Sequence, residues 1–475
     1  MNTKAEPAKK KGIFARIFEI PSRMSLPAQG AAVVAIFLIA LVIFVWVVFL
    51  LDRNNIPWRH SMTYRRILIV IGSVLLLPWL IYEGLRLWME EDRSRFPDID
   101  FAWKAGIREL EEHGLSLNTV PLFIVAGSNS DQQEKSLMQA AGIQFSVRGV
   151  PEGPAPLHWY AHPGGIFLFL SEICQLSALA VLLNKRDAQL AAASPVGQAG
   201  APKAGAPDEA EVEITSRSSA EVSIRLNYVC GLIKRARQPI CPCNGVLVLL
   251  PFNAFRIQGE FSEKFERLVK SDLNALQESL QVRCPVMSLI VGMEHESGFR
   301  ELVRRIGVDR ARVQRFGMGF DVRSPATSAE LSLLGAHISG RFEDWVYNLF
   351  REPGSLSRPG NKQLFALLCQ VRTFLQVRLA SLLANGFGYE AAVNSRSASI
   401  MFCGCYFASV GDTKDRQAFV QGAVEKLVDE HENVEWTQQT LIDDRRNAST
   451  ANITIFLNVI LLVSLILMIA WRYLV

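Results

Sequence analysis

Three long apolar runs stand out in the pattern of hydrophobic and polar positions along the 475-residue chain. They cover residues 31–51, 67–88 and 453–471, and the second contains Pro78. A helix of about 20 apolar residues is long enough to cross the hydrocarbon core of a bilayer. The runs therefore predict a transmembrane hairpin at 31–88 and a third transmembrane helix, with a buried core helix as the alternative for the second run.

The distribution of lysine and arginine predicts the orientation of these helices. The tail at 1–30 and the stretch after the second run are basic, but so is the loop between the first two runs. The third run indicates the orientation more clearly, because Arg445 and Arg446 precede it and only Arg472 follows it. Since positively charged loops stay in the cytoplasm, we expect the tail and residues 89–450 there, and the last few residues across the membrane.

Four shorter apolar runs between the second and third long runs are typical of buried β-strands. They cover residues 120–126, 166–170, 245–250 and 286–291. Between the last two, residues 262–280 repeat leucine and phenylalanine at helical spacing. Continuous apolar strands separated by helices indicate a parallel sheet covered on both faces, so the predicted fold class is α/β.

The composition changes along this region and predicts its subdivisions. Residues 89–327 form the expected α/β domain, and within it residues 188–210 are rich in alanine, glycine and proline, which is typical of a flexible insertion. Leucines at helical spacing predict a helical subdomain at 328–387. A terminal strand and helix at 388–450 complete the predicted cytoplasmic part.

The net charge argues against a nucleic-acid-binding protein, and the spacing of the cysteines argues against a zinc site. The net charge of +4 is small for this length, without a basic stripe, which argues against a nucleic-acid partner. Eight cysteines include two C-x-C pairs, Cys241 with Cys243 and Cys403 with Cys405. Structural zinc sites usually space their cysteines by two to four residues, so we expect these thiols to pack as small hydrophobic side chains instead.

Two histidines, His158 and His162, lie four residues apart, a spacing that also occurs in metal-binding pairs. Pro163 follows them directly, with two glycines after it, and this composition favours a turn. We therefore expect a surface loop here and no metal ligand.

Further segments, in the same order along the chain, resemble motifs of one protein family. Residues 244–248 (NGVLV) resemble its P-I-N-G-V strand, and residues 283–286 (RCPV) with 297–299 (SGF) resemble R-x-P-V-Y and P-G-F. Residues 316–320 (FGMGF) resemble W-G-F-T-F, and 404–409 (GCYFAS) resemble R-G-x-Y-F-T-S. Between a transmembrane hairpin and a third span, these segments make the chain similar to the amino-terminal half of the IcmF/TssM family of type VI secretion proteins.

The resemblance implies a multi-pass protein of the bacterial inner membrane, held in the lipid bilayer, with a P-loop-GTPase-like domain in the cytoplasm. It implies assembly, as an oligomer within a complex, with a TssL/DotU-like inner-membrane protein and with baseplate components of the secretion apparatus. The family normally continues past its third span into a large periplasmic region. We expect that region here to be a separate periplasmic TssM-like chain or to be absent.

The residues after the first predicted strand correspond to the family's phosphate-binding loop. Such a loop needs glycines whose amides wrap the phosphates, a lysine for charge, and a serine or threonine for magnesium. Gly127, Lys135 and Ser136 remain, but the second glycine is absent and the lysine lies two residues too far along. Asp131 and Glu134 would put carboxylates where the phosphates bind.

Two other nucleotide motifs are altered as well. The aspartate expected to hold magnesium is replaced, with Glu172 as a displaced substitute, and the base-recognition motif keeps a carboxylate in Glu294 without its lysine. We therefore predict an interaction scaffold built on a pseudo-GTPase, with no catalytic residue, cofactor or metal. The vestigial site residues would be Gly127, Lys135, Ser136 and Glu294.

Two other functions stay open from the sequence. One is a membrane-anchored NTPase with an atypical phosphate loop, and the other is a membrane interaction protein outside secretion. Nucleotide binding by the purified protein would favour the first of these over the scaffold.

Overall fold

The computed structural model describes most of the chain between the long apolar runs. The described residues are 95–193, 209–238, 240–257, 259–389, 399–446 and 448–450, with short pieces at 34–35, 37–39, 42, 72, 76–84, 452–453 and 456. The chain divides into two compact units, Met1–Pro97 and Asp98–Val475, and the sheet described below belongs to the second.

The three predicted transmembrane helices lie largely outside the described residues. The described pieces of all three runs are helical, and Phe37, Trp79 and Phe456 are exposed there. Among the described residues, one helical segment is long and apolar enough to cross a membrane, Asn361–Phe387. Its leucines are buried within the second unit, so it packs as a helix of the domain core.

The centre of the second unit is an eight-stranded sheet. In spatial order its strands are β2 (Val147–Val150), β3 (Leu157–His162), β4 (Gly165–Leu170), β1 (Leu122–Ala126), β5 (Gly245–Pro251), β7 (Pro285–Val291), β9 (Met401–Phe407) and β8 (Gly317–Gly319). The five strands from β4 to β9 are parallel. Every residue of these five strands is buried, as expected for the middle of a sheet covered on both faces.

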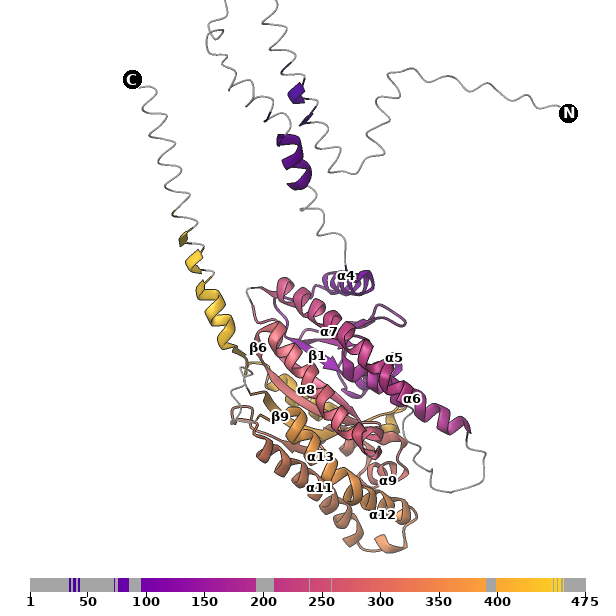
Figure 1. Ribbon diagram of the computed structural model, residues 1–475. Helices are drawn as coiled ribbons and strands as arrows, with labels where there is room; N and C mark the ends of the chain where they lie inside the picture. The colour runs from indigo at the N-terminus through magenta and orange to yellow at the C-terminus, as the bar shows by residue number, and fades with distance from the viewer. Residues whose placement is uncertain are drawn as a thin grey trace, which may run out of the picture. The chain divides into compact units, whose positions relative to one another are not determined.

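Helices cover the two faces, because successive strand residues point to opposite sides of a sheet. The helices are α4 (Pro97–Glu112), α5 (Asp131–Ala140), α6 (Gln175–Ala193), α7 (Glu209–Arg237), α8 (Glu260–Leu280), α9 (Ser297–Ile306), α10 (Val308–Val313), α11 (Ser328–Arg351), α12 (Asn361–Gln370), α13 (Gln376–Leu382) and α14 (Gln421–Asp429). Phe123 and Leu247 share a core cluster with α5 and α14, whereas Val246 and Val286 face α8. In Figure 1, α7 and α8 lie side by side over the sheet.

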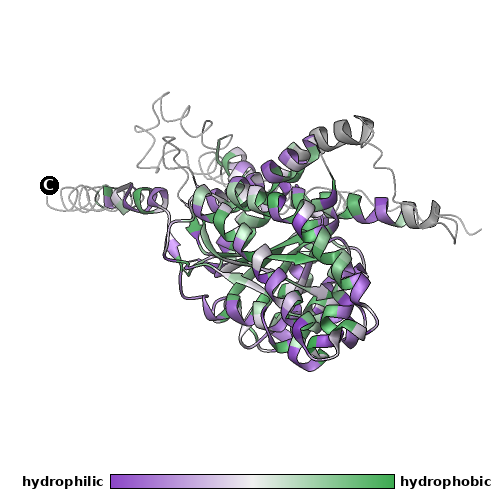
Figure 2. Ribbon diagram, turned by 90° about the horizontal axis from the view of Figure 1, so that it is seen from below, coloured by the Kyte–Doolittle hydropathy of each residue, from purple (hydrophilic) through white to green (hydrophobic). Residues whose placement is uncertain are grey.

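The helical region predicted at 328–387 contains α11, α12 and α13. A π-helical turn at Val371–Leu375 joins α12 to α13, and a second one at Leu383–Phe387 ends the segment. α11 packs along α13 and brings Gly335 against Ala380. Hydrophobic residues concentrate in the strands at the centre of the unit, and polar residues lie on the surrounding helices (Figure 2).

The predicted parallel arrangement holds for the five central strands, whereas the edge strands pair antiparallel. β3 pairs antiparallel with β4, β2 antiparallel with β3, and β8 antiparallel with β9. The turn predicted at Pro163 is present, but it joins two strands of a hairpin and does not belong to a longer surface loop.

The insertion predicted at 188–210 is helical at both ends: residues 188–193 continue α6 and residues 209–210 begin α7, while 194–208 lie outside the described residues. Alanine is the best helix former, which accounts for the longer α6.

Candidate functional site at the carboxyl edge of the sheet

The loops that follow the parallel strands meet at one edge of the sheet, where open α/β sheets bind their ligands. Gly127 follows β1, Ser171 follows β4, and Glu294 lies in the 3₁₀ turn Met293–His295 that follows β7. Lys135 and Ser136 lie on α5, the helix that follows β1. This edge therefore contains the vestigial positions that the sequence predicts, and their contacts decide what it can bind.

Gly127 is held by packing within the protein. Its φ of +94° lies in the region that favours glycine, and a Cβ atom there would come within 2.4 Å of the Leu249 carbonyl oxygen. Its N–H donates to Ser177 Oγ at 3.0 Å, in a buried contact. The glycine that remains of the motif thus has a structural role that requires no phosphate.

The amino terminus of α5 is capped by its own side chains. Ser130 Oγ accepts from the Gln133 N–H at 3.3 Å, and Gln133 Oε1 accepts from the Asn129 N–H at 2.9 Å. These bonds resemble a capping box, except that the glutamine side chain accepts from the residue before the N-cap Ser130. Asp131 adds a negative charge to the first turn. The Gln133 amide is therefore already engaged, and the carboxylate of Asp131 offsets the positive dipole that would attract an anion to this helix terminus.

Lys135 and Ser136 lie past the first turn of α5 and do not face a common ligand position. Lys135 is exposed, whereas Ser136 is buried. Ser136 Oγ donates to Asp412 Oδ1 at 3.1 Å, and Gln132 Nε2 donates to the same oxygen at 3.0 Å. These two hydrogen bonds lower the pKa of the Asp412 carboxyl group. The serine that would bind magnesium in a working loop instead joins α5 to the loop after β10 (Ser409–Val410).

Glu134 lies in a buried polar cluster with His158 on β3 and with Ser171, the residue directly after β4. Its Oε1 accepts from Ser171 Oγ at 2.7 Å, and its Oε2 lies 2.7 Å from His158 Nδ1. The other ring nitrogen, Nε2, lies 2.8 Å from the Gly153 carbonyl oxygen. Burial lowers the pKa of His158, but the hydrogen bond and charge of Glu134 and the Gly153 carbonyl outweigh burial and raise it.

The hydrogen bonds of this cluster need more hydrogens than its neutral side chains supply. Three short contacts each need one hydrogen: His158 Nε2 to the Gly153 carbonyl, His158 Nδ1 to Ser171 Oγ, and Ser171 Oγ to Glu134 Oε1. A neutral imidazole and a serine hydroxyl supply two. A protonated imidazole would supply the third, in line with the raised pKa of His158.

Glu294 is tied to a neighbouring loop as well. Its Oε2 accepts from the backbone N–H of Val410 at 3.1 Å, and its side chain is only 10% exposed. Glu172, the displaced substitute for the magnesium ligand, is exposed. The base-recognition position thus serves to link the loops that follow β7 and β9.

His158 was predicted to lie in a surface loop, and that prediction is wrong. It is 2% exposed on β3, where it contacts Glu134. His162 lies at the far end of the same strand and packs against Phe145 and Phe167, so the two histidines do not form a pair. Pro163 and Gly164, two turn-forming residues directly before the apolar β4, were the sequence signal for a hairpin here.

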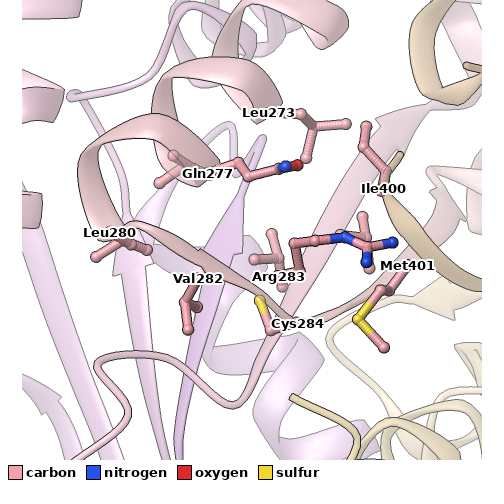
Figure 3. A pocket seen from close by; sticks show the side chains of 11 residues that line it. Leu273, Gln277, Leu280, Val282, Arg283, Cys284, Ile400 and Met401 are labelled. Carbon is pink, nitrogen blue, oxygen red and sulfur yellow. The ribbon is translucent and has the colours of Figure 1, made fainter. Parts of the chain in front are cut away.

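The cysteines lie elsewhere in the fold. All eight are free thiols, and six of them are buried. Cys243 and Cys284 approach to 4.0 Å between their Sγ atoms. Cys284 lines a cavity of about 20 Å³ beneath α8, near Leu273, Gln277 and Met401 (Figure 3). A cavity of this size holds about one water molecule and offers no space for a cofactor.

The fold is that of an α/β protein with a parallel-rich sheet, joined to segments with strongly apolar sequences. The family model of the IcmF-related N-terminal domain matches residues 224–458, from within α7 into the third apolar run. No curated protein and no solved structure matches the chain. The chain belongs to the IcmF-related family. This membership identifies it as a component of an IcmF-type secretion system that associates with the inner membrane.

Proposed function

We propose that the chain is a structural inner-membrane component of a type VI-like secretion complex, and that its α/β domain is a pseudo-GTPase that serves as an interaction scaffold. A strand, a loop and a helix in the order β1, 127–130 and α5 are the parts from which a phosphate-binding loop is built. Here these parts keep the architecture, while their side chains bind one another.

The observation that carries the proposal is the set of polar contacts that join the loops to each other. Glu134 binds Ser171, Ser136 binds Asp412, and Glu294 binds the Val410 amide. A nucleotide would have to break such contacts to reach the backbone. Each typical hydrogen bond contributes about 1 kcal/mol and those to charged groups about 1.5–3 kcal/mol, so displacing them carries a substantial cost.

Electrostatics also opposes a phosphate at this edge. Asp131 and Glu134 lie in the first turn of α5, where a phosphate would dock. Two unit negative charges about 4 Å apart repel by roughly 4 kcal/mol at an effective dielectric constant of 20. Lys135, the one cation kept from the motif, is on the exposed side of α5 and cannot offset this repulsion.

A melting experiment tests the proposal on the full chain in detergent. GTP or ATP with magnesium should leave the melting temperature unchanged, in the parent and in Lys135→Ala alike. A bound ligand at 100 times its dissociation constant would stabilise the folded state by about 2.7 kcal/mol, which such a measurement detects. A nucleotide-dependent shift that Lys135→Ala abolishes would reject the scaffold and favour the membrane-anchored NTPase.

The proposed topology has three spans, with the α/β domain in the cytoplasm. A reporter inserted within 194–208 should report cytoplasm, and one fused after Val475 should report periplasm. The opposite result would reject this orientation. By family resemblance, the partners are a TssL/DotU-like inner-membrane protein and baseplate components, which should co-purify with the tagged chain. A separate periplasmic TssM-like chain is a further candidate partner.

A further inference from the structure

We infer that Asp131, Glu134 and His158 form a binding site for one divalent transition-metal ion of the zinc class. The inference is independent of the proposed scaffold function, since a metal could bind here whether or not the domain binds nucleotide. One potential ligand atom from each of the three residues lies within 4.8 Å of the other two. Among the described residues, these three form the one group of acidic, histidine and cysteine side chains that lie this close together.

The three side chains come from two elements that the fold holds rigidly. Asp131 and Glu134 are three residues apart on α5, so they lie on the same helix face. His158 lies on β3, across from that face. The side chains of Glu134 and His158 are 1% and 3% exposed, whereas that of Asp131 is 31% exposed. The site is therefore dry on the inside and open on the Asp131 side, where an ion can enter.

The orientation of the imidazole suits a metal ligand. Nε2 donates to the Gly153 carbonyl oxygen, and Nδ1 faces Glu134 and Ser171. A histidine that binds a metal usually donates its other ring N–H to a carbonyl or carboxylate, which fixes the tautomer. With Nε2 as the donor, Nδ1 is the nitrogen with a free lone pair.

Glu134 supplies a second observation that points to a cation. Its Oε2 is fully buried and lies 2.7 Å from His158 Nδ1, yet no N–H or O–H is directed at it in hydrogen-bond geometry. The side chains of both partners are almost fully buried, at 1% and 3% exposed, so a cation between them would be shielded from water. A divalent ion placed between the two atoms would satisfy both and displace the proton of the imidazole Nδ1.

The distance between Glu134 and His158 is close to the one that coordination requires, and Asp131 Oδ1 lies 3.9 Å from the imidazole, measured to Nε2. Two ligand atoms bound tetrahedrally at about 2.1 Å from one zinc ion lie roughly 3.4 Å apart. The observed contact between Glu134 Oε2 and His158 Nδ1 is 2.7 Å, so the pair would open by about 0.7 Å. One nitrogen with two carboxylates is a ligand set for zinc, manganese or cobalt, whereas magnesium prefers oxygen ligands only. The nearby Tyr160 stays protonated, since burial and the charges of Glu134 and Asp131 raise its pKa.

Metal binding by the full-length protein tests the site. The purified chain in detergent is treated with chelator, desalted and dialysed against Zn²⁺ at pH 7.5. We expect one zinc per chain, with affinity falling as pH decreases because binding releases a proton. His158→Gln should weaken binding at least tenfold, and Asp131→Asn, at a partly exposed position, should weaken it without unfolding. His337→Gln, the same change at an exposed histidine of α11, should leave the affinity unchanged.

Cobalt distinguishes this site from the cysteines. Co²⁺ bound to the chain should show ligand-field bands without the strong near-ultraviolet charge-transfer bands of thiolate ligands. Thiolate bands, equal affinity in the parent and both site variants, or an absence of stoichiometric binding in the parent would each overturn the inference. Circular dichroism of His158→Gln shows whether that variant is folded, and Asp131→Asn decides the question if it is not.

Discussion

Replacing Gly127 by alanine tests whether this glycine serves the fold or a ligand. At Gly127, φ is +94°, and a Cβ atom would meet the Leu249 carbonyl oxygen at 2.4 Å and Leu176 Cδ2 at 3.0 Å. The unfavourable backbone conformation costs about 1–3 kcal/mol. Steric overlap in a close-packed core adds about 1–3 kcal/mol, since Leu249 belongs to a central strand that cannot move freely. We therefore expect Gly127→Ala to lower the free energy of unfolding by about 2–6 kcal/mol.

Gly307 provides a matched control. It has the same φ of +94°, but a Cβ atom there would meet nothing within 4 Å. Gly307→Ala should therefore lose only the backbone contribution, about 1–3 kcal/mol. The two variants should differ by about 1–3 kcal/mol, which is the cost of the overlap at Gly127.

Chemical denaturation of the full chain in detergent, without nucleotide and followed by tryptophan fluorescence, measures both variants against the parent. Equal unfolding midpoints for Gly127→Ala and Gly307→Ala would refute the packing argument. A Gly127→Ala variant as stable as the parent that had lost nucleotide binding would assign the glycine to a phosphate instead.

Two further variants probe buried charges at other places in the domain. Burial raises the pKa of Asp272 to about 7, although its Oδ2 accepts from the Leu176 N–H at 2.8 Å. A raised carboxyl pKa means that stability is lost as pH rises from about 4 to 7, so Asp272→Asn should flatten the pH dependence of the denaturation midpoint over that window. Arg237 is 3% exposed and donates to the carbonyl oxygens of Val120 and Cys241 at 2.8 Å each. Arg237→Ala should destabilise by about 3 kcal/mol or more, because the buried acceptors lose their donor, whereas Arg235→Ala, at an exposed position of the same helix, should change the midpoint little.

The central strands could be predicted from the sequence because each is a continuous apolar run. The runs at 120–126 and 286–291 match β1 and β7 to within two residues. β2 and β8 carry no such signal: β2 is the tetrapeptide VRGV, and β8 is the tripeptide GMG. Such short strands form because a neighbouring strand offers free backbone groups, and that neighbour is distant in sequence for β8, which pairs with β9.

The position of the site could be predicted from the sequence, but its contacts could not. The loop after β1 follows from the first apolar strand and from the family resemblance. The bond from Ser136 to Asp412 joins residues 276 positions apart, and the bond from Glu294 to Val410 joins residues 116 apart. Such pairs depend on which loops the sheet brings together, and a local sequence pattern carries no information on this. The burial of His158 escaped prediction for the same reason, because Glu134 and Ser171 provide its polar surroundings.

The residues that depart from the phosphate-loop pattern are also residues that hold the loops together. Glu134, which would repel a phosphate, accepts from Ser171 and faces His158. Glu294, left without its lysine, accepts from the Val410 amide. In a nucleotide-dependent domain, the ligand supplies the contacts that order these loops, about 2.7 kcal/mol at 100 times its dissociation constant. Two hydrogen bonds to charged groups, at about 1.5–3 kcal/mol each, supply a comparable amount within the chain. On the proposed scaffold function, these bonds take the place of a ligand in ordering the loops, which favours a domain with one fixed surface for its partners.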